Sequence, residues 1–125
     1  MYPQELRYSE SHQWARKEDG TVTVGITHYA QSQLGDLVYV ELPQVGQEVS
    51  AGQPLGSVES VKAVADVNAP VSGKVIAING PVPDAPETVN QDCYGAGWLV
   101  KIEMSNTSEM DQLLTAEAYQ QQLQK

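Results

Sequence analysis

Lys62 stands in a setting that suits a chemical attachment point. It lies in the segment VESVKAVAD, and turn-forming glycine, proline and asparagine residues flank this segment on both sides. A lysine at the tip of a tight turn between two strands presents its amine in a fixed direction and leaves the nitrogen accessible to a modifying enzyme. The same pattern fits a surface lysine paired loosely with Glu59 and Asp66, worth less than about 1 kcal/mol. Spacing alone does not choose between these two interpretations.

The other reactive side chains form no catalytic or metal-binding pattern. Cys93 is the single cysteine, so it cannot form an intramolecular disulfide, and we expect a small buried residue without a chemical role. His12 and His28 are too isolated in the sequence to form a metal-ligand set. No Ser/His/Asp, Cys/His or phosphate-loop arrangement stands out, so we do not expect an enzyme.

Length and charge narrow the class of protein. The 125 residues, 41% of them hydrophobic, predict a single domain over 1–125 with one core. Sixteen acidic against seven basic residues give a formal charge of −9, which disfavours nucleic acid and anionic membranes as partners. No apolar window approaches the roughly 20 residues of a membrane-spanning helix. We therefore expect a soluble protein of a reducing compartment.

Short β-branched runs must form the framework around Lys62. They alternate with Gly, Pro and Asn residues and read TVTVGI, DLVYVEL, PLGSVES, ADVNAPV and GKVIAI. This pattern is typical of an all-β sandwich or barrel. Two strand-rich halves meet at a turn whose tip spans residues 60–64, with Lys62 in it.

Helical signals occur in two places. Thr27 is suited to cap a helix over 28–34, and Gly35 is placed to end it. Near the C-terminus, Ser108 followed by Asp111 resembles a capping box, and apolar residues recur at helical spacing after it. The sequence therefore predicts a C-terminal helical segment over about 108–124.

The stretch GSVESVKAVADVNAPVSGKVIAING, residues 56–80, resembles the lipoyl-lysine hairpin of the glycine cleavage H-protein family. The resemblance continues in order through SHQW, EDGTVTVGIT, YAQ, LGD, VYVELPQVGQEVSAG and YGAGWLVKI. Together these segments cover residues 9 to about 101. A lone VKA would be weak evidence, whereas this ordered set is specific.

The resemblance implies a barrel-sandwich hybrid of two small antiparallel sheets, with lipoate in amide linkage to Lys62. It also implies a non-catalytic carrier. Such a carrier takes the aminomethyl group of glycine from a PLP-dependent glycine decarboxylase (P protein) to a tetrahydrofolate aminomethyltransferase (T protein). Dihydrolipoamide dehydrogenase (L protein) then reoxidises the arm. We expect a monomer in a bacterial cytoplasm, although a mature mitochondrial form would look similar.

Two further sets of residues follow from the resemblance. A lipoate-attaching enzyme would recognise the hairpin through Glu59, Ser60, Val61, Ala63 and Asp66. The loaded arm would be sheltered in a cleft by Ser11, Gln13 and Asp66. Most family members carry Glu where this chain has Gln13, and an amide lacks the charge that stabilises an ammonium group. We therefore expect sheltering to rely more on Asp66 and the loaded state to live for a shorter time.

Other carriers and a non-carrier stay open as alternatives. Lipoyl domains of 2-oxoacid dehydrogenases typically place Asp before the lysine and biotinyl domains flank it with Met, and Val61 and Ala63 match neither. A relay of lipoyl groups to other proteins and a degenerate module without a prosthetic group are also compatible with the fold. The modification state of Lys62 would separate the last of these from a carrier.

Overall fold

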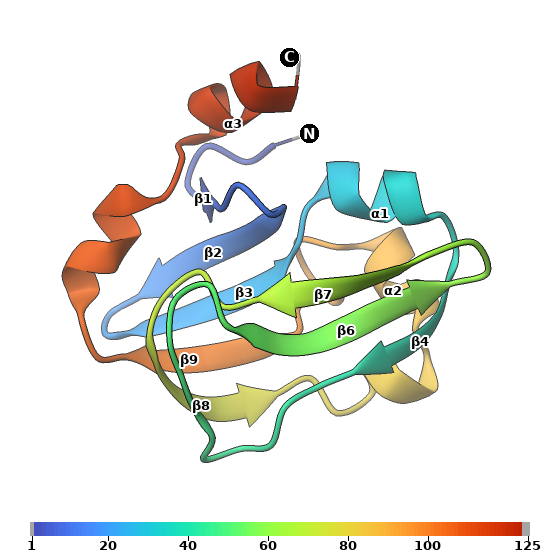
Figure 1. Cartoon of the computed structure of the whole chain (residues 1–125), viewed down its shortest axis with the longest axis horizontal. Coiled ribbons are helices and arrows are strands. Elements are labelled where there is room, and N and C mark those ends of the chain that lie inside the picture. The colour runs from blue at the N-terminus through green and yellow to red at the C-terminus, as the bar shows by residue number, and fades with distance from the viewer. Residues whose placement is uncertain (1, 124–125) are drawn as a thin grey trace.

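The computed structural model describes residues 2–123, and strands dominate it (Figure 1). The strands are β1 (Arg7–Tyr8), β2 (Gln13–Glu18), β3 (Thr21–Ile26), β4 (Leu37–Glu41), β5 (Glu48–Val49), β6 (Pro54–Ser60), β7 (Val64–Asn68), β8 (Gly73–Ile78) and β9 (Val100–Met104). The helices are α1 (His28–Leu34), α2 (Glu87–Gln91) and α3 (Ala116–Leu123), and the 3-10 turns are η1 (Val82–Asp84) and η2 (Thr107–Gln112).

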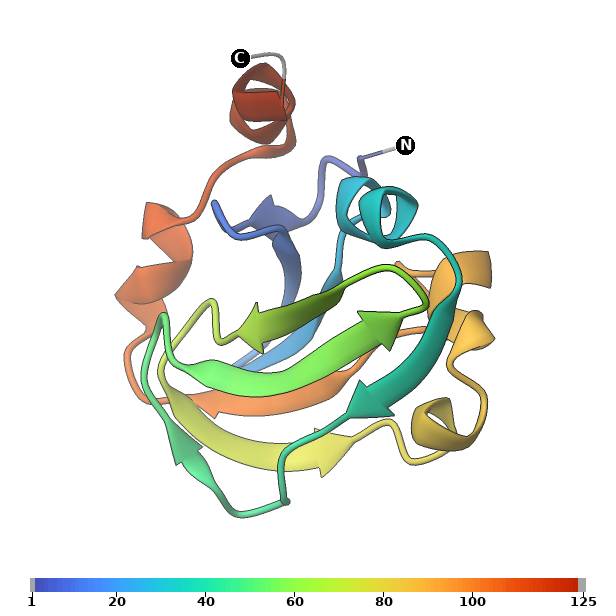
Figure 2. The ribbon, with the colours of Figure 1, turned by 45° about the vertical axis from the view of Figure 1, so that its right-hand side comes forward.

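The strands form two antiparallel sheets, which confirms the predicted fold class. Within the described residues, one sheet has six strands in the order β1-β2-β3-β9-β8-β5, and the other has three in the order β4-β6-β7. The smaller sheet covers one face of the larger (Figures 1 and 2). The two sheets stay separate in this part of the chain, so they form a sandwich rather than a closed barrel.

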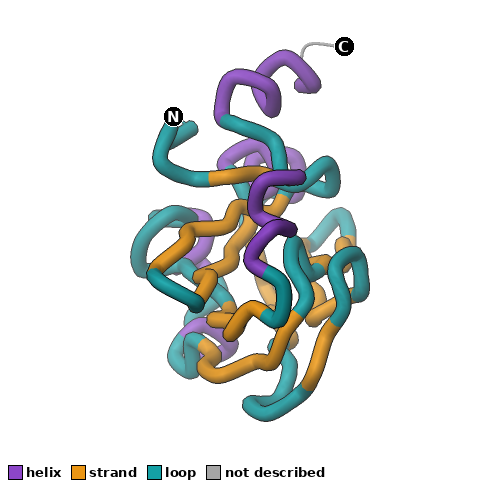
Figure 3. Tube along the Cα trace, turned by 90° about the vertical axis from the view of Figure 1, so that its left-hand side faces the viewer, coloured by secondary structure: helices purple, strands orange, loops and turns teal. Residues whose placement is uncertain are grey.

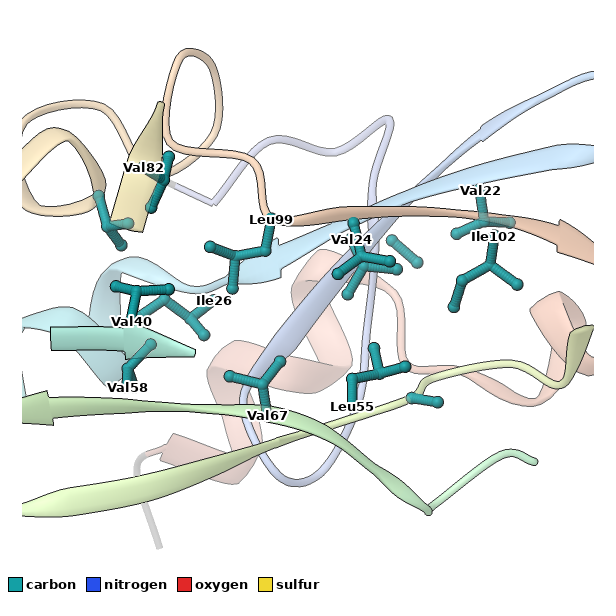
Figure 4. Packing of buried hydrophobic residues seen from close by; sticks show 14 of the residues in the cluster. Val22, Val24, Ile26, Val40, Leu55, Val58, Val67, Val82, Leu99 and Ile102 are labelled. Carbon is teal, nitrogen blue, oxygen red and sulfur yellow. The ribbon is translucent and has the colours of Figure 1, made fainter. Parts of the chain in front are cut away.

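Slim apolar side chains fill the space between the sheets. Val24 and Ile26 of β3 are buried, and so are Val58 of β6 and Val67 of β7. Figure 4 shows these side chains pointing toward one another from opposite sheets. Because side chains alternate between the two faces of a strand, Val22, Val24 and Ile26 of β3 all face this core, whereas register shifts interrupt the alternation in β4 and β6. The β6–β7 hairpin is thereby fixed on the rest of the molecule.

A second, aromatic cluster attaches the C-terminal helix. Tyr8, Trp14 and Tyr119 are fully buried, and the rings of Tyr8 and Tyr119 stack with centroids 4.9 Å apart. In side view, α3 extends beyond the sheets (Figure 3). Its buried residues Ala116 and Tyr119 belong to the same cluster as Tyr8 of β1. The cluster thus joins the two ends of the chain.

The helix predicted over 28–34 is confirmed as α1. The Thr27 hydroxyl accepts a hydrogen bond from the Ala30 amide at 3.2 Å, as an N-cap should. Gly35 ends the helix at φ 80°, a backbone conformation that glycine adopts without strain. Its amide donates to the Gln31 carbonyl.

The helical segment predicted over about 108–124 consists of two short pieces, η2 and α3, with extended backbone between them. Asn106, not Ser108, caps the short turn η2, and Leu114 then forms a bridge with Tyr8 through paired backbone hydrogen bonds of 2.7 and 2.8 Å. Strand pairing requires extended backbone, so the helix restarts only at α3. Residue 124 lies outside the described residues. The short elements η1 and α2 were not predicted, because three to five residues carry too little periodicity.

Gly25 offers a test of this packing. It pairs with Trp14 across β2 and β3, and a β-carbon there would lie 2.6 Å from ring atoms of Trp14. We expect Gly25→Ala to lower the free energy of unfolding by about 1–3 kcal/mol, because the buried ring must move. Gly20→Ala is the matched control, since its β-carbon meets nothing within 4 Å. Urea unfolding of both variants checks this, and equal stabilities would contradict it.

Candidate functional site

Lys62 lies at the tip of the β6–β7 hairpin, in a turn that Ser60 holds together. The Ser60 amide donates to the Ala63 carbonyl at 2.8 Å. The Ser60 hydroxyl oxygen accepts hydrogen bonds from the amides of Lys62 at 3.3 Å and Ala63 at 3.2 Å. Ser60 is buried, whereas Val61, Lys62 and Ala63 are exposed. The backbone of the turn is therefore fixed while the lysine side chain projects from it.

The lysine stem lies against the end of α1. A β-carbon added to Gly35 would be 3.6 Å from Cε of Lys62. Within the described chain, the single ion pair joins Arg16 to Glu18, so Lys62 is not paired with Glu59 or Asp66. The loosely paired surface lysine, one of the two interpretations of the sequence, thus finds no support in the geometry.

Asn90 supports this corner of the site, and no local sequence pattern predicted its role. Its side-chain nitrogen donates to the carbonyl of Gly35 at 2.9 Å, and its side-chain oxygen accepts from the amide of Leu37 at 2.9 Å. One amide from α2 therefore ties the end of α1 to the start of β4. This loop is the one against which the Lys62 stem rests.

A cleft of about 170 Å³ lies between α1, the edge of β7 and the turn before β2. Its lining is mostly apolar, and it includes Ser11, His12, Gln13, Ile26, Tyr29, Ala30, Gln33, Leu34, Val58, Ala65 and Asp66. The structure therefore brings together the three residues assigned to a cleft from the sequence, although Asp66 is more than 50 positions from the other two. Asp66 is exposed, and Gln13 is buried.

The Gln13 side chain is already engaged within its own turn. Its oxygen accepts hydrogen bonds from the hydroxyls of Ser9 at 2.6 Å and Ser11 at 2.5 Å. Its nitrogen donates to the Ser11 carbonyl at 2.9 Å. An amide can satisfy all three partners at once, because it carries both an acceptor and donors. Gln13 thus holds the shape of this wall of the cleft.

The residues assigned to recognition of the hairpin have different settings. Glu59, Val61, Ala63 and Asp66 are exposed and can be contacted. Ser60 is only 4% exposed, and its contacts are within the turn. Cross-strand pairs place Tyr39, Glu59 and Val64 side by side across the smaller sheet, all of them exposed. An apolar and acidic surface therefore adjoins the turn.

Trp14 and Cys93 are structural. The Trp14 indole nitrogen donates to the Cys93 carbonyl at 2.8 Å, and the ring is fully buried. Burial raises the pKa of the Cys93 thiol to about 11, so the sulphur stays protonated at neutral pH. Among residues 2–123 no group of His, Cys, Asp and Glu could hold a metal ion, and no helix could span a membrane.

Two packed antiparallel sheets with a lysine at the tip of the β6–β7 hairpin have the architecture of a lipoyl-type domain. The model of the glycine cleavage H-protein family matches residues 6–125, and the chain belongs to that family. Its members are carrier subunits of the glycine cleavage system rather than catalysts.

Curated relatives and a solved structure agree with this assignment. The chain is 58% identical to a glycine cleavage system H protein of Neisseria meningitidis over 118 residues, 94% of this chain and 92% of the relative. It is 56% identical to one of Bacillus cytotoxicus over 117 residues, with the same shares covered. The crystal structure of a glycine cleavage system H protein from Mycobacterium marinum matches with a TM-score of 0.91 and 42% identity, over 98% of this chain and 99% of that one.

Replacement of Asn90 tests the corner beside Lys62. We expect Asn90→Ala to lower the free energy of unfolding by about 1–3 kcal/mol, since Leu37 N–H and Gly35 C=O lose their partner. Amide hydrogen exchange at Leu37 should accelerate. The control, Asn106→Ala, removes an exposed cap of η2 and should leave this exchange unchanged. If the Leu37 amide in Asn90→Ala exchanged as slowly as in the wild type, the supporting role of Asn90 would be refuted.

Proposed function

We propose that this chain carries lipoate in amide linkage to Lys62. The observation that carries this proposal is the placement of an exposed, unpaired lysine on a rigid turn beside a cleft. A modifying enzyme needs the amine accessible, and the fixed backbone presents it in one direction. Bound lipoate supplies a cyclic disulfide that takes up a carbon fragment and two electrons together.

The carrier shuttles the aminomethyl group of glycine between enzymes of the glycine cleavage system. It receives the group at the PLP-dependent decarboxylase, delivers it at the tetrahydrofolate aminomethyltransferase, and is reoxidised at dihydrolipoamide dehydrogenase. The family assignment supports this division of labour. A tethered group searches each docked active site at high effective concentration, so one arm can serve all three.

The cleft gives the arm a resting place between these encounters. Lys62 begins beside Gly35, at the end of α1, and four residues of α1 line the cleft. A void of about 150 Å³ accepts a molecule as large as benzene, so the cleft of about 170 Å³ can admit a small ring. Its apolar lining suits sulphur and carbon, and Asp66 offers a carboxylate for an ammonium group.

Docking on the partner enzymes must be brief, because a carrier bound tightly to one cannot reach the next. The charge of −9 favours fast association with basic surfaces and fast release at cellular salt. The turn and the cleft belong to one chain, so a monomer is sufficient. We place it in the bacterial cytoplasm, in keeping with its bacterial relatives.

Intact-mass analysis with peptide mapping tests the attachment site. Protein from cells that make lipoate should carry a lipoyl increment on Lys62, and Lys62→Arg should carry none. Lys74→Arg is the matched control, because it removes an exposed lysine from β8 and should leave the increment in place. An unmodified Lys62 under these conditions would favour a module without a prosthetic group.

The lifetime of the loaded carrier tests the cleft. We expect Asp66→Asn to shorten it by about 5- to 30-fold, since a charge-assisted hydrogen bond is worth about 1–2 kcal/mol. Glu59→Gln should not change it, because Glu59 is an equally exposed carboxylate of the hairpin that does not line the cleft. Formaldehyde release after glycine-dependent loading provides the measurement.

The same measurement tests position 13. A carboxylate there would add a charge near the carried amine, so Gln13→Glu should lengthen the lifetime. Equal decay rates in Gln13→Glu and the wild type would show that position 13 does not act on the loaded arm.

A further inference from the structure

The hydroxyl of Tyr119 joins α3 to two walls of the cleft. It lies 2.7 Å from the hydroxyl oxygen of Thr27 and 2.7 Å from Nδ1 of His12. Thr27 caps α1, and His12 belongs to the turn before β2. The backbone reinforces the link, since the Thr27 amide donates to the His12 carbonyl at 3.1 Å. One buried tyrosine thus connects elements more than 90 residues apart in the sequence.

The positions of the protons in this network follow from counting donors and acceptors. The Thr27 oxygen accepts from the Ala30 amide, and Thr27 is fully buried. Among the described residues, Tyr119 is the one partner left for the Thr27 hydroxyl hydrogen. A buried hydroxyl hydrogen without a partner is costly, so Thr27 donates to Tyr119. Tyr119 must then donate its own hydrogen to Nδ1 of His12.

This order fixes the tautomer of His12. An imidazole whose Nδ1 accepts a hydrogen bond carries its proton on Nε2. Burial lowers the pKa of His12 below its ordinary value, which also favours the neutral ring. Burial raises the pKa of Tyr119 to about 12, so its hydroxyl keeps its proton. The backbone of His12, at φ 78°, is in a region that few non-glycine residues occupy.

His12 lines the cleft, and Nε2–H has no partner within the part of the chain that the structure describes. Its titratable neighbours are Tyr119 of α3, Tyr29 of α1, whose ring centroid lies 4.8 Å away, and Asp66 of β7 on the cleft lining. His12 adjoins the N-terminal end of α1, whereas Lys62 adjoins its C-terminal end. The far end of an arm on Lys62 would therefore reach His12.

We propose that Thr27 and Tyr119 hold His12 as the Nε2-protonated tautomer, and that His12 donates this proton in a hydrogen bond to the lone pair of the carried amine in its neutral form, the form that decays, whereas Asp66 stabilises its ammonium form. This inference rests on the proposed function. A carried amine is lost when its nitrogen lone pair forms a C=N bond as the C–S bond breaks, with the electron pair leaving on sulphur. A hydrogen bond to that lone pair makes it less available and slows the loss. His12 binds the carried group, and Tyr119 is a positioning residue.

Nitrogen NMR of the His12 ring tests the network without lipoate. In unmodified protein with labelled histidine, Nε2 should be the protonated nitrogen at neutral pH and Nδ1 the acceptor. Tyr119→Phe should mix the two tautomers and raise the His12 pKa toward its ordinary value, because the neutral ring loses a donor. Tyr8→Phe is the matched control: it removes a hydroxyl that donates to Pro3 from the ring stacked on Tyr119. A protonated Nδ1 in the wild type would overturn the proposal.

Decay of the loaded carrier tests the action on the arm. Because tautomer mixing leaves only part of the population able to donate from Nε2, Tyr119→Phe should decay about 2-fold faster than Tyr8→Phe. Thr27→Ser keeps the relay hydroxyl and should retain the wild-type rate and tautomer. An unchanged rate in Tyr119→Phe, with its tautomer shifted, would overturn the role of His12 while leaving the carrier intact. If Tyr119→Phe does not fold, the tautomer of His12 in the wild-type protein by itself tests the proposed hydrogen-bond network.

Discussion

The position of the Lys62 turn depends on apolar contact between the inner faces of the two sheets. The contacts are made by slim side chains, such as Val24 of β3 and Val58 of β6, that fill the space without large rings. Close packing of this kind transmits position, because a buried side chain cannot shift without displacing its neighbours. The β6–β7 hairpin is anchored by its inner face, so its outer end keeps a constant direction relative to α1. The turn that contains Lys62 therefore keeps the same direction relative to α1.

Hydrogen bonds fix the backbone of the turn that contains Lys62, whereas no ion pair among the described residues holds its side chain. This difference suits a carrier. The Ser60 hydroxyl fixes the turn, while the lysine side chain lacks an ion pair within the described chain. A tether is effective when its base is fixed and its stem is free, since the reachable volume is then small and centred on the docked active site. A lysine held by Glu59 or Asp66 would first have to break that contact.

The cleft is assembled from parts that have little in common in the sequence. Its walls come from the turn before β2, from α1 and from the edge of β7, and the aromatic cluster links the first two to α3. Tyr119 is buried on all sides and bonds with Thr27 and His12 through one oxygen. The C-terminal helix, although it lies beyond the sheets, thus belongs structurally to the cleft (Figure 3).

The sequence by itself determined the features that depend on neighbouring residues. Alternating β-branched runs predicted the strands, Thr27 and Gly35 predicted the limits of α1, and the VESVKA turn predicted the position of Lys62, because each is governed by backbone conformation and period over a few residues. Only the tertiary structure decided the rest. Leu114 is extended because Tyr8 pairs with it, Asn90 supports a loop more than 50 residues away, and Tyr119 sets the proton of His12. These contacts arise from packing between distant segments, and no local pattern records which segments will meet.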